Sequence, residues 1–195
     1  NYIDNFASKN NILSCNFLYV NENWGKHLKS LGYQEWINTS SEWKNNGENT
    51  FDDFLSRFNS NQRRNIKKER KSISTKNLDI KIHTQESINL EIVQKMHNFY
   101  EQHCLRWGVW GSKYLTSKFF ENILENKKNL IIFSASRNDS GSTIAMSMCV
   151  KNEKNMWGRY WGSQEEILNL HFELCYYQPI AVSYTHLRAH ETRHY

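Results

Sequence analysis

The sequence predicts an α/β (α+β) fold in which helices flank a mixed β-sheet. In its second half, hydrophobic periodicity gives the order strand, helix, helix, strand, strand, strand, helix. Two of those strands, Leu130–Ser136 and Thr143–Val150, are joined by NDSGS, which is typical of a β-hairpin turn. Aromatic residues make up 14% of the 195-residue chain, which indicates a packed core.

Residues 1–49 predict the C-terminal remnant of a first domain. Apolar residues indicate strands at 12–20 and 32–37, with a short helix over Trp24–Leu31 between them. The chain begins with Asn rather than Met and shows no signal-peptide pattern, so we expect an interior fragment of a longer protein.

Residues 50–77 predict a basic helix that connects this remnant to a second domain. Thr50 and Asp53 have N-cap spacing, and an apolar stripe follows from Phe51 at helical spacing. Six cations then lie within nine residues, opposed only by Glu69. They are Arg63, Arg64, Lys67, Lys68, Arg70 and Lys71. This cluster is either a solvated helix face, an anion site for substrate phosphates, or a general nucleic-acid-binding surface.

Residues 78–180 predict the second domain. Leu78–Ile82 alternates as a strand does, and Thr84 is the expected N-cap of a helix that extends to about residue 106. Thr116 is the expected N-cap of a second helix, and the last predicted strand is Asn155–Trp161.

The densest group of charged and aromatic residues begins in that last strand. If it alternates regularly, Trp157, Arg159 and Trp161 share one face, so the guanidinium lies between two indoles. Such an arginine still presents a fork of donors to an anion or a carbonyl. Gly158 and Gly162 then share the other face, where a backbone or a ligand can approach closely.

A short helix is expected next, over Leu170–Gln178, because Ser163 or Asn169 can cap it and Pro179 disfavours a helical residue before it. Helical spacing divides its side chains between two faces. One face carries His171, Leu174, Cys175 and Gln178, and the other carries Glu173, Tyr176, Tyr177 and Ile180. A relay between His171 and Glu173 is therefore not expected. Each residue also has an ordinary structural interpretation, but so many polar groups exceed what packing requires.

Composition limits the remaining classes. The net charge is +5, and no run of about 18 apolar residues exists, so no membrane span is expected. The cysteines have no Cys-x-x-Cys spacing, so the sequence supports neither a zinc site nor a dense disulfide framework. We expect free thiols in a cytoplasmic protein. The cysteines are Cys15, Cys104, Cys149 and Cys175.

A family resemblance appears at GRYWG (158–162) and LHFELCYYQPI (170–180). These strings strongly resemble the predicted N-acyltransferases related to the Fem peptidoglycan aminoacyltransferases (FemAB-like), a branch of the GNAT superfamily. FDDFL (51–55), NQRRNIKKER (61–70) and KYLTSKFF (113–120) support the resemblance, which covers roughly residues 15–180. It implies a GNAT-like acyltransferase fold, a whole protein with two such domains in tandem, and a cleft with Tyr114 and Trp110 near its rim.

The resemblance implies transfer of an acyl or aminoacyl group to an amine acceptor, with a peptidoglycan precursor as one candidate. Such chemistry needs a base for the amine proton and donors for the tetrahedral oxyanion. Glu173 or His171 is the candidate base, and Arg159 with one of the two tyrosines is expected to position the carbonyl or protonate the leaving group. The expected substrate-binding residues are Trp157, Trp161, Tyr176, Gln178, Tyr114, Arg63, Arg64, Lys67, Lys68 and Arg70, with Tyr177 among the catalytic candidates.

The donor is expected to be acyl-CoA or aminoacyl-tRNA, with no tightly bound cofactor. No Gly-x-Gly turn follows a predicted strand, whereas the basic helix suits tRNA phosphates. The alternative from another class is a non-catalytic module that binds an anion or nucleic acid through this helix.

A metal motif ends the chain. His190, Glu191 and His194 have the His-Glu-x-x-His spacing of zinc peptidases, which makes a zinc hydrolase the remote alternative. The motif ends one residue before the terminus, and the spacing indicates no third ligand. SYTHLRAHET also resembles a translated sequencing adapter, so we expect 181–195 to be a non-native tail, the second domain to be incomplete, and no metal to be bound.

Overall fold

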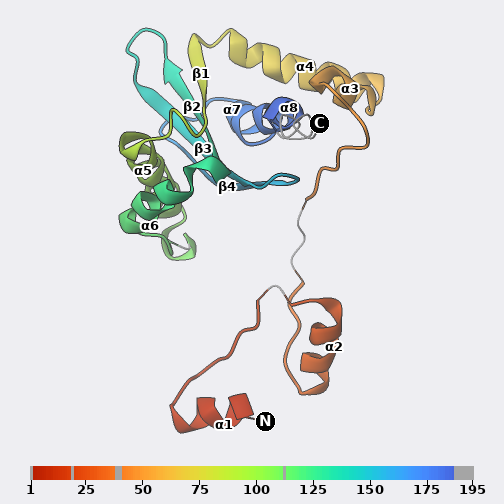
Figure 1. Ribbon diagram of the computed structural model, residues 1–195, viewed down its shortest axis with the longest axis vertical. Coiled ribbons are helices and arrows are strands. Elements are labelled where there is room, and N and C mark those ends of the chain that lie inside the picture. The colour runs from red at the N-terminus through yellow and green to blue at the C-terminus, as the bar shows by residue number, and fades with distance from the viewer. Residues whose placement is uncertain (1, 19, 38–40, 112, 187–195) are drawn as a thin grey trace, which may run out of the picture. The chain divides into compact units, whose positions relative to one another are not determined.

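A computed structural model describes residues 2–18, 20–37, 41–111 and 113–186 (Figure 1). The chain divides into two compact units, Asn1–Lys44 and Asn45–Tyr195. The boundary places the predicted basic segment in the second unit, together with the sheet.

The first unit contains helices α1 (Tyr2–Lys9) and α2 (Glu22–Ser30) in its described residues. The short helix predicted near α2 is confirmed, and Asn21 caps it by accepting a hydrogen bond from the backbone N–H of Trp24 at 3.0 Å. The helix α1 was not predicted.

The two strands predicted at 12–20 and 32–37 are wrong, because the described residues of both segments form no ladder and are mostly exposed. A strand needs a neighbouring strand to pair its backbone groups, and the described part of this unit provides none. Side-chain contacts hold the coil instead. The Tyr33 hydroxyl donates to Asp4 Oδ1 at 2.6 Å, and the Tyr33 ring packs edge-on against Phe17.

The second unit is built on a four-stranded sheet in the order β1-β2-β3-β4. Its strands are β1 (Leu78–His83), β2 (Leu130–Arg137), β3 (Thr143–Lys151) and β4 (Met156–Ser163), which confirms all four strands predicted in this half. The α/β class with flanking helices is also confirmed. All three pairings are antiparallel, so the parallel pairing of a mixed sheet is absent from the described strands. Two successive hairpins produce the β2–β3 and β3–β4 pairings, because tight turns join only antiparallel neighbours.

One face of the sheet is covered by α5 (Leu90–Arg106) and α6 (Ser117–Asn122). The 3₁₀ segments η1 (Gly108–Trp110) and η2 (Ile123–Asn129) join these helices to each other and to β2. The core on this face combines α5 and α6 side chains with alternate residues of β2 and β3. It includes Val93, Met96, Phe99, Tyr100, Phe120, Leu130, Ile132, Met146 and Met148.

The other face is covered by α4 (Ser60–Ser74) and by a helical segment near the end of the described chain. That segment consists of α7 (Leu170–Phe172), a π-helical turn η3 (Glu173–Tyr177) and α8 (Gln178–His186). The second core lies between these elements and the remaining strand residues. It includes Ile73, Ile131, Phe133, Ala145, Cys149, Leu170, Leu174 and Val182.

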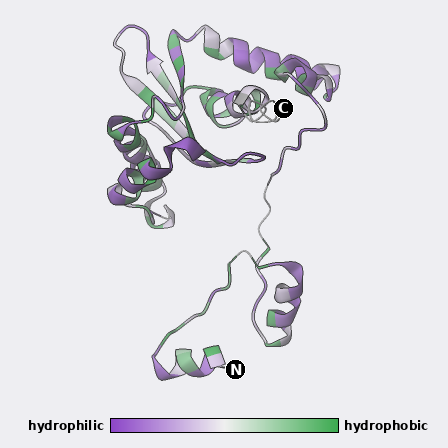
Figure 2. Ribbon diagram, in the orientation of Figure 1, coloured by the Kyte–Doolittle hydropathy of each residue, from purple (hydrophilic) through white to green (hydrophobic). Residues whose placement is uncertain are grey.

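The predicted basic helix is two helices, α3 (Phe51–Ser56) and α4, rather than one. Thr50 and Asp53 form a complete capping box at the start of α3, as their spacing predicted. The chain then breaks because Asn59 caps α4 by accepting from the backbone N–H of Gln62 at 3.0 Å. In Figure 2, α4 is largely hydrophilic.

The start of α5 also differs from the prediction. Residues 85–87 form a turn, and the helix begins at Leu90, because the Asn89 side chain accepts from the backbone N–H of Ile92 at 3.0 Å. Asn is as good an N-cap as Ser or Thr, so Asn89 can start the helix in place of the predicted Thr84.

Candidate functional site

The candidate residues of β4 are arranged by a β-bulge. Tyr160 pairs with Met148 and Gly158 pairs with Cys149, which leaves Arg159 without a partner in the β3–β4 register. A single extra residue reverses the face to which every residue beyond it points.

The bulge corrects the prediction that Trp157, Arg159 and Trp161 share a face. Trp161 packs against the core beneath α4 and α7, whereas Trp157 lies opposite Val150, which packs against the α5 core. The two indoles are therefore on opposite sides of the sheet, and Arg159 does not lie between them. Arg159 is exposed, and 46% of Trp157 is accessible to solvent.

Gly162 lets β4 approach α5 closely, as the sequence predicted for a glycine face. A Cβ atom built on Gly162 would lie 2.1 Å from the Phe99 carbonyl oxygen, a distance that no side chain tolerates. Gly158, by contrast, has open space at the same position and lies on the other face.

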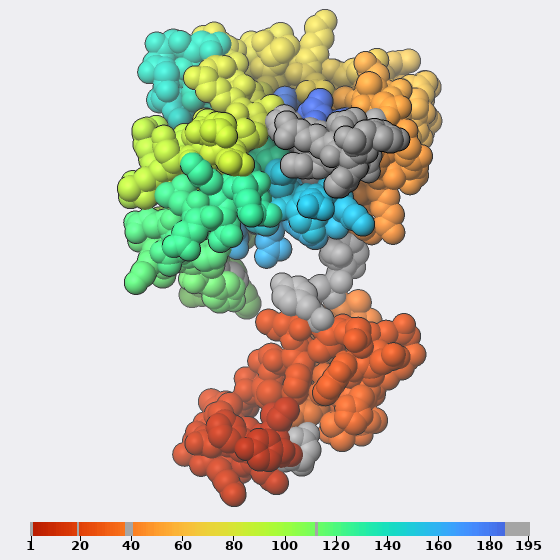
Figure 3. Space-filling view, in the orientation of Figure 1, coloured from red at the N-terminus to blue at the C-terminus, as the bar shows by residue number. Residues whose placement is uncertain are grey.

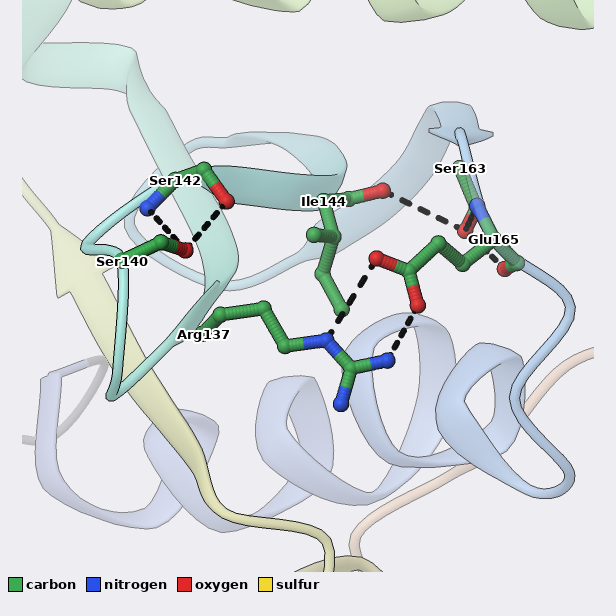
Figure 4. Close-up of polar contacts among 6 residues, drawn as sticks. All are labelled: Arg137, Ser140, Ser142, Ile144, Ser163 and Glu165. Carbon is green, nitrogen blue, oxygen red and sulfur yellow. Dashed lines mark hydrogen bonds and ion pairs between the residues drawn. The ribbon is translucent and has the colours of Figure 1, made fainter.

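The loop after β4 is fixed to the β2–β3 hairpin, which sets where the following helix begins (Figure 4). Arg137 at the end of β2 forms an ion pair with Glu165, and its Nε lies 3.4 Å from Glu165 Oε1. Ser163 Oγ lies 2.5 Å from the Glu165 carbonyl oxygen and 3.3 Å from that of Ile144. Ser163 is thus the last residue of β4 and not a helix cap.

Asn169 stands at the predicted N-cap position of α7, but its side chain makes no cap hydrogen bond. The residue has a left-handed backbone conformation with φ of 69°. Its Nδ2 instead donates to Ser72 Oγ of α4 at 3.0 Å, which ties the start of α7 to α4.

The predicted end of the helix at Gln178 is wrong, since η3 leads directly into α8. Pro179 has no N–H, and its ring would collide with the carbonyl four residues earlier in a regular α-helix. The wider π-helical turn avoids this collision. In it the Gln178 N–H donates to the Glu173 carbonyl, five residues earlier. The Leu174 carbonyl that this shift releases accepts a hydrogen bond from Ser147 Oγ of β3 at 2.6 Å.

The same turn changes which side chains face each other. Gln178 was predicted to lie with His171, but its Nε2 donates to Glu173 Oε1 at 2.7 Å. Residues five apart lie above each other in a π-helix, whereas an α-helix aligns residues three or four apart.

Glu173 is also held by Arg70 of α4. Arg70 Nε lies 3.2 Å from Glu173 Oε2 and 3.3 Å from Oε1, and Arg70 Nη2 lies 3.1 Å from Oε1. The carboxylate is 4% exposed, and the Arg70 guanidinium is stacked over the Phe51 ring at 4.5 Å. The structure therefore joins three predicted site residues, Glu173, Gln178 and Arg70, into one buried cluster.

Tyr177 belongs to the same cluster through a residue that was not predicted. Its hydroxyl donates a short hydrogen bond to Glu69 Oε2 of α4. Burial and this bond to Glu69 raise the pKa of Tyr177 above its ordinary value. The sequence feature that could have identified Glu69 is its position as the single acid among six cations.

An open groove of about 630 Å³ lies beside this cluster, between α3, α4 and β1. It combines apolar walls with three cations, two carboxylates and one amide. Its lining includes Phe51, Leu55, Lys67, Arg70, Lys71, Ile80, Glu173 and Gln178.

A second cluster forms around His171, which is exposed at the surface of α7. The imidazole makes edge contacts with Trp161 of β4 at 5.2 Å and with Tyr176 of η3 at 5.6 Å between ring centroids. The neighbouring Phe172 ring contacts Tyr176 at 5.9 Å and Tyr177 at 6.4 Å, so it connects the two clusters.

The pKa of His171 is lowered from its ordinary value, first by partial burial and then by the charge of His103 on α5. A histidine with a lowered pKa is neutral at pH 7 and has a ring nitrogen that can accept a proton. This is the electrostatic condition of a general base.

The remaining predicted residues are separate from both clusters. Arg63 Nη1 donates to the Phe58 carbonyl at 2.9 Å, so it caps the end of α3. Arg64 and Lys68 are exposed on α4. Tyr114 is 83% exposed beyond η1.

The metal hypothesis is not supported by the described part of the chain. No group of three or more His, Cys, Asp or Glu side chains there could hold a metal ion. His190, Glu191 and His194 lie outside the described residues. In α8, Val182 and Tyr184 are buried, while the non-native origin of 181–195 stays a prediction.

A search among curated proteins finds no match to the chain. The family model for FemAB-like proteins, described as peptidoglycan biosynthesis/recognition, matches residues 1–190. A match over almost the whole chain shows that it belongs to the FemAB-like family of peptidoglycan biosynthesis or recognition.

Proposed function

We propose that this chain transfers an acyl or aminoacyl group from an activated donor to an amine acceptor, with His171 as the general base. The observation that supports this most is the surface position of the imidazole against Trp161 and Tyr176, together with its lowered pKa. A neutral base at the protein surface can reach an amine substrate.

In the proposed reaction the amine nitrogen attacks the carbonyl carbon of the donor. A carbon–nitrogen bond forms, and the carbon–oxygen bond of an aminoacyl ester, or the carbon–sulfur bond of a thioester, breaks. The amine proton passes to His171, which then returns it to the leaving oxygen or sulfur. The Tyr176 hydroxyl, on a side chain 47% exposed, is the proposed donor to the tetrahedral oxyanion.

Glu173 is a poorer base than His171. Both carboxylate oxygens accept hydrogen bonds from Arg70, and Oε1 also accepts one from Gln178. Removing a proton from an amine would require the buried Glu173 carboxylate to give up these bonds. We therefore assign Glu173 a positioning role, in which it fixes η3 to α4. Tyr177 has the same role, since its hydroxyl is already donated to Glu69.

Aminoacyl-tRNA is the donor that the surface of α4 favours. Four exposed cations lie at i, i+3, i+4 and i+7, which places them on one helix face. A stripe of this kind matches a phosphate backbone better than a single pyrophosphate. Its members are Arg64, Lys67, Lys68 and Lys71.

The acceptor that the family description favours is an amine of a peptidoglycan precursor. Trp161 beside His171 is the proposed wall for this acceptor. We place the reaction in the cytoplasm, because all four cysteines are free thiols, as is usual for proteins of a reducing compartment.

A single-turnover assay with aminoacyl-tRNA and an amine-bearing precursor tests the proposal. His171→Gln is expected to lower the transfer rate by about 10²- to 10⁴-fold, the usual loss when a general base is removed. Glu173→Gln, assayed under conditions where circular dichroism shows it folded, is expected to stay within about tenfold of the parent. A full rate for His171→Gln would remove it from the role.

The cationic stripe favours a second candidate, a module that binds nucleic acid without catalysis. Arg64→Glu/Lys68→Glu should weaken tRNA binding and reduce the slope of log K against log salt by about two. Lys95→Glu/Lys127→Glu, which makes the same charge change on other elements, is the matched control. Salt-dependent binding of the parent chain with no transfer to any amine would favour this candidate over the enzyme.

A further inference from the structure

The turn between α5 and α6 exposes an unusual amount of apolar surface. Trp107 is 63% exposed, Val109 94% and Trp110 84%. Single exposed apolar residues are ordinary on protein surfaces, but three large ones within four positions form a patch, and such patches mark interaction sites. We call Trp107, Val109 and Trp110 the apolar tip.

The backbone around the apolar tip is held in place, so the exposure does not result from a loose segment. Gly111 is packed so tightly that a Cβ atom would lie 1.9 Å from the Cys104 carbonyl oxygen of α5. On the far side, the buried Tyr100 hydroxyl accepts from the backbone N–H groups of Tyr114 at 3.0 Å and Leu115 at 3.2 Å. The fold fixes both sides of the tip and leaves its side chains in solvent.

The composition of the tip fits a lipid bilayer surface better than a small ligand. Trp has an apolar ring with one polar N–H, and it concentrates where hydrocarbon meets water. A bilayer also accepts such side chains without a complementary cavity. The α3–α4 groove and the hollow at the β3–β4 hairpin are lined by other residues.

Positive charge beside the apolar tip favours a bilayer with anionic headgroups. Lys118 follows it and is exposed, whereas Arg106, which precedes it, donates from Nη2 to the Ser163 carbonyl oxygen at 2.5 Å. Lys113 is also cationic, but it is paired with Glu101 at 2.5 Å. Cations near inserted aromatic residues are attracted to anionic headgroups.

The tip lies on the α5–α6 side of the sheet, away from α4 (Figure 3, green and yellow respectively). None of the helices in the described part of the chain is long and apolar enough to cross a bilayer. From these observations we infer that the chain docks on anionic lipid bilayers through Trp107, Val109 and Trp110, an activity independent of the proposed transfer reaction.

Co-sedimentation of the whole chain with vesicles tests this inference. The parent should bind vesicles that contain phosphatidylglycerol and bind pure phosphatidylcholine vesicles less. Trp107→Ser/Val109→Ser/Trp110→Ser should lower the partition coefficient for anionic vesicles about tenfold or more, because the inserted apolar area is lost. Circular dichroism should show an unchanged fold, since all three side chains are exposed.

The matched control is Leu13→Ser/Trp36→Ser/Leu168→Ser, which removes three similarly exposed apolar residues elsewhere. It should bind anionic vesicles as the parent does. The inference is overturned if the parent does not bind vesicles, if both triple variants lose binding equally, or if phosphatidylcholine binds as well. It is also overturned if the tip variant instead abolishes self-association in analytical ultracentrifugation while vesicle binding persists.

Discussion

Arg70 of α4 and Glu173 of η3 form an ion pair with three hydrogen bonds across 103 positions of the sequence, and its carboxylate side is buried. The pair connects the basic helix to the π-helical turn, and Gln178 completes the coordination of the carboxylate. Such a pair contributes little net stability, because burying both charges costs about as much as their attraction returns. It does make one arrangement of these two elements much more favourable than any other.

Removing one partner of this pair should be costly. Arg70→Met is expected to lower the free energy of unfolding by about 3 kcal/mol, because it leaves a buried carboxylate without its cation. Arg70→Met/Glu173→Leu should recover most of that loss. Urea denaturation of the single and double variants measures both values.

The control for that experiment is Lys67→Met on the same helix. Lys67 is 64% exposed and lies 3.9 Å from Asp52, so its loss should cost about 0.5 kcal/mol or less. A double variant that is no more stable than Arg70→Met would contradict the explanation.

The two glycines of β4 should respond differently to the same substitution. Gly162→Ala pushes a methyl group into the Phe99 carbonyl of α5, which cannot move without the helix, so a loss of about 2 kcal/mol or more is expected. Gly158→Ala meets open space and should change stability by about 0.5 kcal/mol or less. Thermal melting of the pair checks this, and equal melting temperatures would show that the close approach is not rigid.

Ser147 should matter to the π-helical turn. It is 1% exposed, and its hydroxyl satisfies the Leu174 carbonyl that the turn releases. Ser147→Ala leaves that buried acceptor unpaired and is expected to cost about 1–3 kcal/mol in urea denaturation. Ser74→Ala, which removes an exposed hydroxyl bonded to the Lys71 carbonyl, is the comparison and should be nearly neutral.

Stability should fall on mild acidification. Burial lowers the pKa values of His83, His103 and His171, so at pH values near their unfolded pKa the unfolded chain binds more protons than the folded chain. Their contribution to stability is present above about pH 6.5 and is lost as the pH falls through the lowered folded values. Urea midpoints at pH 7.5 and 5.5 measure the difference.

A variant identifies part of this effect. His83 Nε2 lies 2.8 Å from Ser134 Oγ on the sheet, and His83→Gln can keep a hydrogen bond there without titrating. The dependence of its urea midpoint on pH should be weaker than that of the parent. An unchanged dependence would mean that other groups dominate in this range, and a steeper one would contradict a lowered pKa of His83.

Local sequence signals determined much of the second unit. The capping box at Thr50 and Asp53 depends on residues three apart, and NDSGS joins β2 and β3 as a hairpin because its turn needs no distant contact. Apolar residues also predicted β1 to β4 correctly, and each of these strands has a neighbouring strand with which to pair. The same pattern failed at 12–20, where the described part of the unit supplies no neighbouring strand.

The candidate site was decided by tertiary structure. The sequence supplied the residues around His171 and Glu173 and the family resemblance, but regular periodicity assigned several of them to the wrong face. The bulge at Arg159 turns Trp157 away from Trp161, and the widened turn before Pro179 brings Gln178 to Glu173. Both irregularities shift the register by one residue, and only packing against β3 and α4 determines whether that shift is favourable.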